Sequence, residues 1–172
     1  MTDVYIVVYS LIGILISLPG LLLALNLLLP GVSERVQVRL NETPGRSFVL
    51  GVPVAGAFLL FIAITSQIPG GQAFAFIAGG LGMGLGTLGA AGMARLLGQR
   101  LNAYTGPLSR LKSITLGAAV YELACLVPIV GWFLFAPLVG TALLGAAVFA
   151  LLGWLPKPVA RNQSAVVGNQ SA

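Results

Sequence analysis

Glu122 is the residue of this sequence most able to do chemistry, because its carboxyl group lies deep inside a long apolar segment. It follows Lys112 by about ten residues, or about 15 Å along a helix, which places it near the middle of a bilayer. A carboxylate at that depth is unfavourable by several kcal/mol unless it is paired or neutralised. Glu122 is therefore a candidate for carrying protons or cations through a membrane.

A structural role for Glu122 is the favoured alternative. Its protonated carboxyl could hydrogen-bond to Thr87 or Thr141 of a neighbouring helix. Its ionised form could instead pair with Arg95. An ion path usually needs a second polar side chain at matching depth and two halves related by a repeat, and neither is clear in the sequence. The sequence thus favours a packing acid over an ion path.

A row of glycines at helical spacing gives a second signal, within the apolar segment from Ala73 to Ala94. Gly80 and Gly84 form one GxxxG pair, and Gly82 and Gly86 form another. Small residues four apart let a second helix backbone approach closely. We expect these glycines to pack against this chain's own helices, with a subunit contact or a ligand groove as the alternative. The small residues expected to receive them are Ala142, Ala146 and Ala150.

The composition excludes most catalytic and redox chemistry. The chain has no His and a single Cys, Cys125, so the usual ligands of haem, iron–sulfur clusters, zinc and copper are missing. Paired carboxylates and the G-x-S-x-G and H-E-x-x-H motifs are missing as well. We therefore predict that the chain is not an enzyme and has no evident cofactor. Bound lipid, or a pigment held by Glu, Asn or a backbone carbonyl, stays compatible with the sequence.

The composition also indicates that the bilayer is the solvent. Hydrophobic residues make up 58% of the 172 residues and charged residues 8%, whereas a soluble chain carries about a quarter charged residues. We expect an all-α membrane protein with one polytopic domain over residues 1–156. A polar C-terminal tail over residues 157–172, which contains NQSA twice, should follow it.

The apolar runs predict five transmembrane helices, with four as the alternative. The first run covers residues 4–33, where Pro19 and Gly20 predict a kink. A polar loop is expected over residues 34–46. The second helix is expected over Phe48–Thr65 and the third over Ala73–Ala94, with a tight Pro/Gly turn between them.

The last apolar stretch, Ser113–Pro156, is too long to cross once. As one straight helix it would reach about 66 Å, twice the thickness of the hydrocarbon core. A turn at Pro128–Gly131 would make a tight C-terminal helical hairpin with Trp132 and Trp154 at opposite interfaces. The mixed segment 95–112 should lie partly along the interface.

The positive residues predict the orientation. They lie at Arg35, Arg39, Arg46, Arg95, Arg100, Arg110, Lys112, Lys157 and Arg161. Five crossings with the N-terminus outside put all nine on the cytoplasmic side, whereas four would leave the tail pair opposite the others. This topology accounts for the net charge of +5 without a nucleic-acid partner, since no basic stripe with aromatics is present. We expect a multi-pass protein of a prokaryotic cytoplasmic, or internal photosynthetic, membrane.

Several short motifs resemble a known kind of membrane protein. They are PGVSERVQVRL (30–40), PGRSFVLG (44–51), LLGQRL (96–101), LVPIVGW (126–132), Gly140 and Gly145. Over residues 30–155 the chain resembles a prokaryotic multi-span membrane module of unassigned activity that occurs beside bactofilin-like, polymer-forming repeats. No β-helical repeat follows the last apolar segment here. The resemblance implies a membrane module and supplies no catalytic residues.

These observations favour a non-catalytic membrane subunit or scaffold of a larger assembly, which packs through its Gly/Ala-rich helix faces. Its expected partners are membrane lipid and other membrane protein subunits, and a homo-oligomer is also compatible. The alternative is a small oligomeric transporter or channel with Glu122 in the path.

Overall fold

The computed structural model describes residues 2–106 and 108–154, and these residues are helical apart from short connections. The elements in chain order are α1 (Thr2–Leu28), α2 (Pro30–Glu42), α3 (Pro44–Ser66), α4 (Gln72–Thr105), α5 (Arg110–Leu126), the π-helical segment η1 (Val130–Phe135) and α6 (Ala136–Leu151). No strand occurs in the described ranges, and the prediction of an all-helical chain is confirmed. The predicted tail, 157–172, lies outside these ranges.

Four of the described helical segments are long and apolar enough to cross a membrane. They are Val8–Leu28, Pro44–Ser66, Gln72–Thr105 and Val130–Leu151. Large apolar side chains face outward on them, such as Phe76 and Phe133, each 80% exposed. An apolar surface of this kind suits lipid and not water. The length and composition of these helices confirm the prediction of a membrane-embedded, multi-pass protein.

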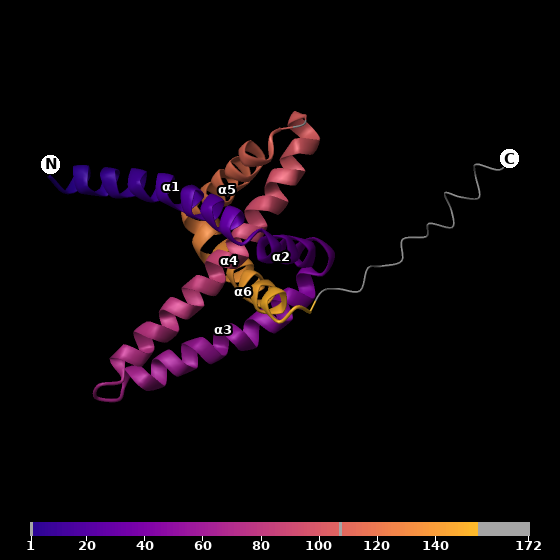
Figure 1. Ribbon diagram of the computed structural model, residues 1–172. Helices are drawn as coiled ribbons and strands as arrows, with labels where there is room; N and C mark the ends of the chain where they lie inside the picture. The colour runs from indigo at the N-terminus through magenta and orange to yellow at the C-terminus, as the bar shows by residue number, and fades with distance from the viewer. Residues whose placement is uncertain (1, 107, 155–172) are drawn as a thin grey trace, which may run out of the picture.

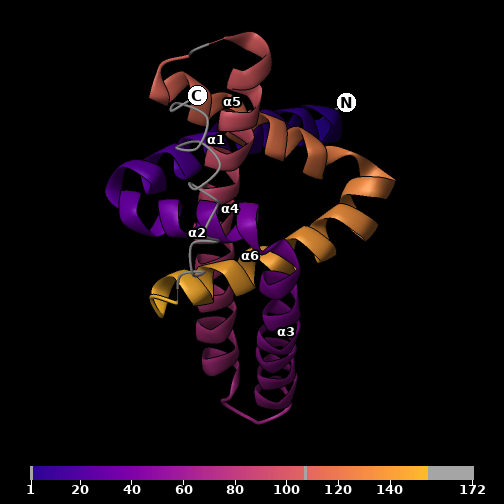
Figure 2. The ribbon, with the colours of Figure 1, turned by 90° about the vertical axis from the view of Figure 1, so that its right-hand side faces the viewer.

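The long helix α4 contacts each of the other α-helices (Figure 1). Its first half pairs with α3 in a hairpin that extends from the rest of the molecule, and α5 packs along its second half (Figure 2). Helix α6 crosses the first half of α3 and also contacts α4, while α2 lies against both α4 and α6. The core lies where these helices meet.

The first helix ends where a proline begins the next one. Helix α1 continues through Pro19 and Gly20, and the kink expected there stays a prediction. The regular helix breaks instead between Leu28 and Pro30, where Pro30 occupies the first turn of α2. Proline is well suited to that position, because the first amides of a helix have no partner inside it.

The polar loop predicted over residues 34–46 is wrong, because most of it forms α2. Val32, Val36 and Leu40 follow one another at intervals of four and place one apolar stripe against the core. Glu34 and Glu42 lie on the exposed side. The charged residues marked the segment as polar, but their spacing is that of an amphipathic helix.

Two expectations about helix ends also need correction. Helix α4 does not end at Arg95 but continues to Thr105, since its charged residues are good helix formers. The C-terminal hairpin is open and not tight. The chain turns after Leu126, but α5 packs mainly on α4 and α6 mainly on α3. The small residues that favour close approach lie on those two helix pairs.

Helices α3 and α6 cross at a pair of glycines. A Cβ atom on Gly51 would overlap the carbonyl oxygen of Thr141 and approach the amide of Gly145. A Cβ atom on Gly145 would in turn overlap the carbonyl oxygen of Ser47. The two backbones are therefore in direct contact, which is the packing that a small residue at every fourth position allows.

Helices α4 and α5 cross in the same way. A Cβ atom on Gly117 would overlap the carbonyl oxygen of Ala94 and the amide of Gly98, and one on Gly98 would overlap the backbone of Ser113. In both pairs, the helix that crosses carries a Ser-x-x-x-Gly pair, and this helix is α3 in the first pair and α5 in the second. The helix that it meets carries Thr-x-x-x-Gly in α6 and Ala-x-x-x-Gly in α4.

The two halves of the chain share further sequence segments besides the Ser-x-x-x-Gly pair, although this relation is not clear from the sequence pattern alone. The matching segments occur in the same order, namely RLN at 39–41 and 100–102, RSFVLG at 46–51 and KSITLG at 112–117, and LGAA at 88–91 and 144–147. The two LGAA segments meet in the core, where Ala90, Ala91 and Ala146 are buried together. Each half thus provides a basic helix end, a crossing helix and a small-residue helix.

The crossings make a testable prediction about stability. Gly51→Ala and Gly117→Ala should each lower the free energy of unfolding by about 1–3 kcal/mol, because the added methyl group displaces a helix backbone. Gly56→Ala is the matched control in α3, since a Cβ atom there meets nothing within 4 Å. Thermal unfolding of the purified protein in detergent measures all three. Equal unfolding of the Gly51 and Gly56 variants would contradict the close crossing.

Candidate functional site

Glu122 lies in the packed interior, as its position in an apolar segment suggested. Its side chain is 4% exposed, and Oε1 has no hydrogen-bond partner among the described residues. It shares one face of α5 with Ile114 and Ala118, which are also buried. Oε1 has therefore lost contact with water without gaining a donor.

The partners expected for Glu122 use their hydrogen bonds elsewhere. The Thr87 hydroxyl donates to the carbonyl of Gly84, 2.9 Å away, inside its own helix. Thr141 likewise donates within α6. Arg95 Nη1 donates to the carbonyl of Pro30 at 2.9 Å, at the start of α2. None of these three contacts reaches Glu122.

A second buried polar side chain, Asn26 of α1, was missed by sequence reasoning. It is 1% exposed, and its Nδ2 donates to the carbonyl of Leu22 at 2.8 Å and to that of Ala91 in α4 at 2.9 Å. Its Oδ1 is buried without a partner. The available signal was its isolation, since LLLALNLLLP contains no other polar side chain.

The helix register places Asn26 and Glu122 at nearly the same level. Gly98 of α4 meets Ser113 of α5, and Ala94 meets Gly117, so the two helices are antiparallel and keep the same register between these contacts. The same register, extended along α5, places Glu122 level with Gly89 of α4. Asn26 is bonded at Ala91, two residues or about 3 Å along α4. The contact of α1, α4 and α5 therefore contains two polar groups at matching depth.

The glycines predicted to pack against other helices behave differently from one another. A Cβ atom on Gly80, Gly84 or Gly86 would meet nothing within 4 Å, and one on Gly82 would only touch the ring of Phe58 at 3.7 Å. The glycines of α4 that this chain does cover come later, at Gly89, Gly92 and Gly98. Of the predicted receiving residues, Ala146 and Ala150 are buried and Ala142 is half-buried. The first half of α4 therefore presents uncovered glycines.

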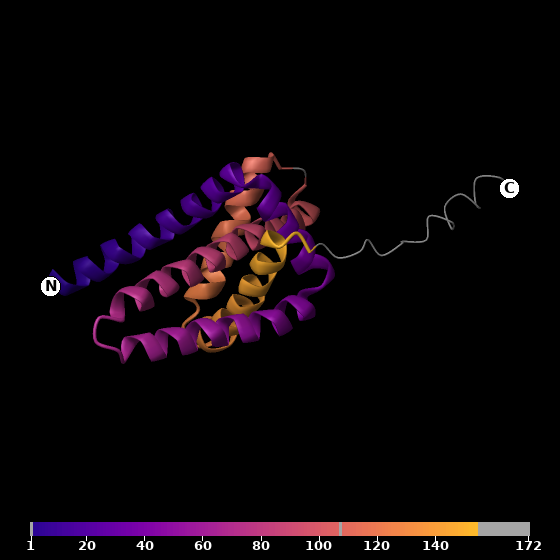
Figure 3. The same ribbon diagram turned by 60° about the horizontal axis from the view of Figure 1, so that its bottom comes forward.

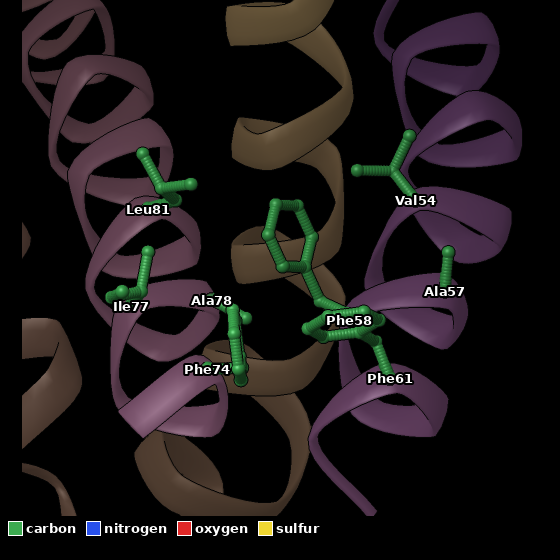
Figure 4. Close-up of a pocket in the computed structure, with 8 residues that line it drawn as sticks. All are labelled: Val54, Ala57, Phe58, Phe61, Phe74, Ile77, Ala78 and Leu81. Carbon is green, nitrogen blue, oxygen red and sulfur yellow. The ribbon is translucent and has the colours of Figure 1, made fainter. Parts of the chain in front are cut away.

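Apolar grooves follow the α3–α4 hairpin. One has a volume of about 430 Å³ and lies between the two helices, where Phe58, Phe61 and Phe74 gather (Figure 4). Another has a volume of about 640 Å³ and is lined in part by Gly79, Gly80 and Met83 of α4. Such surfaces accept lipid chains or another apolar helix.

Two arginines of α2 hold the end of α6. Arg39 is 6% exposed, its Nε donates to the carbonyl of Trp154 at 2.7 Å, and its guanidinium lies 4.2 Å from the centre of the Phe149 ring. Arg35 Nη1 reaches the carbonyl of Ala150 at 3.5 Å. Burial is the main reason that the pKa of Arg39 lies below the ordinary arginine value, with Arg46 adding to it. Cations at the carboxyl end of a helix satisfy its free carbonyls and its dipole.

The described residues show no arrangement for metal chemistry. Within 2–106 and 108–154, no group of three or more His, Cys, Asp or Glu side chains is placed to hold a metal ion. Cys125 is a free thiol in α5.

Comparisons with known proteins give no relative. No protein-family model matches the chain, and neither a curated protein nor a solved structure matches it. Its function must be inferred from its own geometry.

The arginine contacts at the end of α6 give a second prediction. Arg39→Met should lower the free energy of unfolding by about 1.5–3 kcal/mol, because it removes charged donors from the Trp154 carbonyl. Arg46→Met is the control, since Arg46 is exposed on the neighbouring segment. Thermal unfolding in detergent compares the two. An Arg39 variant as stable as the Arg46 variant would show that these contacts add nothing.

Proposed function

We propose that this chain is a non-catalytic membrane subunit or scaffold whose α3–α4 hairpin docks against a helix of another subunit. The observation that carries the proposal is the set of uncovered glycines in the first half of α4. Gly80 and Gly84 form a GxxxG pair whose Cβ positions this chain leaves open. The same helix uses its later glycines for close packing inside the chain.

The shape of the hairpin supports this role. It extends from the packed helices (Figures 1 and 2), and large apolar side chains on both α3 and α4 are exposed. Exposed Phe76 and Met83 flank the glycines and provide the large side chains of a helix–helix contact. A flat glycine surface between larger side chains favours a helix over a lipid chain, because backbone contact requires the small residues. A scaffold role also agrees with the resemblance to modules found beside polymer-forming repeats.

We further propose five crossings with the N-terminus outside and the C-terminus in the cytoplasm of a prokaryote. The start of α1 and the α3–α4 turn lie toward one end of the molecule, and the α2–α3 connection, beside Arg46, lies toward the other (Figure 3). A fifth crossing requires α5, whose 17 residues span about 25 Å. The one-sided distribution of positive residues supports it.

A small oligomeric transporter is the second candidate, and Asn26 favours it. The level of Asn26 matches that of Glu122, and a second polar group at that depth is what an ion path requires. The related sequence segments of the two halves agree with it as well, since transporters often contain repeats. The close backbone contacts around Gly117 argue for a static interior. We therefore place this function second.

The topology prediction can be tested with single cysteines in a Cys125→Ala background. Gln67→Cys in the α3–α4 turn should react with a membrane-impermeant maleimide from outside, and Asn41→Cys at the end of α2 only from inside. Ile129→Cys should react from outside if α5 crosses. Its protection from outside would mean that the α5–α6 hairpin turns back within the membrane, and reaction of Gln67→Cys only from inside would reverse the orientation.

The docking prediction uses substitutions that the isolated chain tolerates. The double substitution of Gly80→Leu and Gly84→Leu should abolish the parent's association in mild detergent while leaving the unfolding temperature unchanged, because these sites touch nothing in the chain. Gly56→Leu, at another open site on α3, is the matched control. Native mass measurement of complexes extracted from membranes gives the readout and separates self-association from a different partner. A double variant that assembles like the parent would assign this face to lipid.

A further inference from the structure

We propose that Asn26 and Glu122 form one proton-binding site in the contact of α1, α4 and α5. Glu122 carries an exchangeable proton, and Oδ1 of Asn26 accepts its hydrogen bond directly or through one water molecule. The proposal does not depend on the docking role of the α3–α4 hairpin, since it concerns different helices.

The orientation of the Asn26 amide defines the acceptor. Its Nδ2 donates to two carbonyl oxygens, of Leu22 and Ala91, so a rotated amide would put oxygen against oxygen at both. Oδ1 is therefore the free end of the group, and it is buried without a donor. A buried acceptor of this kind needs a proton donor from elsewhere.

Glu122 can be that donor. Its Oε1 is also buried without a partner, and the helix register places it about 3 Å from the level of Asn26 along α4. Two acceptor oxygens alone leave each other unsatisfied, whereas one proton satisfies both. The neutral acid also avoids the cost of a buried charge. Release of the proton to water leaves a carboxylate, and its return restores the pair.

The neighbouring ionisable groups are few. Helix α4 contributes Arg95, four residues beyond Ala91 and bonded to the carbonyl of Pro30. Helix α1 has no ionisable side chain after Tyr9, and η1 has none. On α5 itself, Tyr121 and Cys125 adjoin Glu122. Arg95 lies about 9 Å from the Glu122 level along α4.

Infrared titration of the whole protein in lipid vesicles tests the proposal. The chain has four acidic side chains, and Glu34 and Glu42 are exposed, so a buried protonated carboxyl gives a separate band. We expect this band to be absent from Glu122→Gln. Asn26→Leu should lower its titration midpoint by about one pH unit, a tenfold loss of proton affinity, because Oδ1 stabilises the protonated acid and disfavours the carboxylate.

Asn102→Leu is the matched control, because the Oδ1 of Asn102 is also buried without a partner but lies about 16 Å further along α4. Its midpoint should equal that of the parent. If Asn26→Leu does not fold, Asn26→Ser, which shortens the side chain, replaces it. Equal midpoints for the Asn26 and Asn102 variants would overturn the shared site. A midpoint that falls when sodium chloride replaces choline chloride would assign the site to a metal cation and overturn the proton.

Discussion

Direct backbone contact at paired glycines is the constraint on which the arrangement depends. Lipid tails are as apolar as the side chains, so burial of apolar surface gives helices in a bilayer little reason to associate. Close approach provides the dispersion contacts instead, and only a missing side chain permits it. Gly51 with Gly145, and Gly98 with Gly117, bring two helix pairs together. The long helix α4 contacts α3, α5 and α6, and so it connects the two pairs.

Polar side chains then stabilise the points where regular helices end. The carbonyls of Trp154 and Pro30 accept from Arg39 and Arg95, and Asn26 bonds to Ala91 just before the α1–α2 break. Carbonyls without a donor are costly where water is scarce, and Arg39 supplies a donor to the Trp154 carbonyl just beyond the end of α6. Arg95 instead links α4 to the first turn of α2. Glu122 differs from them, since no described donor reaches its Oε1.

The sequence predicted the all-helical chain, the α3–α4 turn and the burial of Glu122, because each depends on local composition. Long apolar runs gave the helices, and Pro69 with Gly70 and Gly71 gave the turn, where Gly70 has a φ of 81°. The errors came from tertiary contacts. The sequence predicts a loop over most of α2, since the apolar stripe of Val32, Val36 and Leu40 is short and is buried only by contact with α4 and α6. The GxxxG pairs predict packing within the chain, but their spacing does not say which helix covers them. Asn26 escaped notice because its partner is 65 residues away.

The paired crossings have a consequence for the origin of the chain. Segments RLN, [RK]-S-x-x-L-G and LGAA recur in one order, and the second segment contributes the Ser-x-x-x-Gly face of a close helix crossing in both halves. Tandem duplication of an ancestral gene segment leaves this pattern. A unit that contains two antiparallel helices returns the chain to the end at which it began. Copying such a unit adds helices without reversing the segments that follow. The two copies could then diverge. Glu122 occurs in only one of them, at the position that aligns with Gly56 in the other.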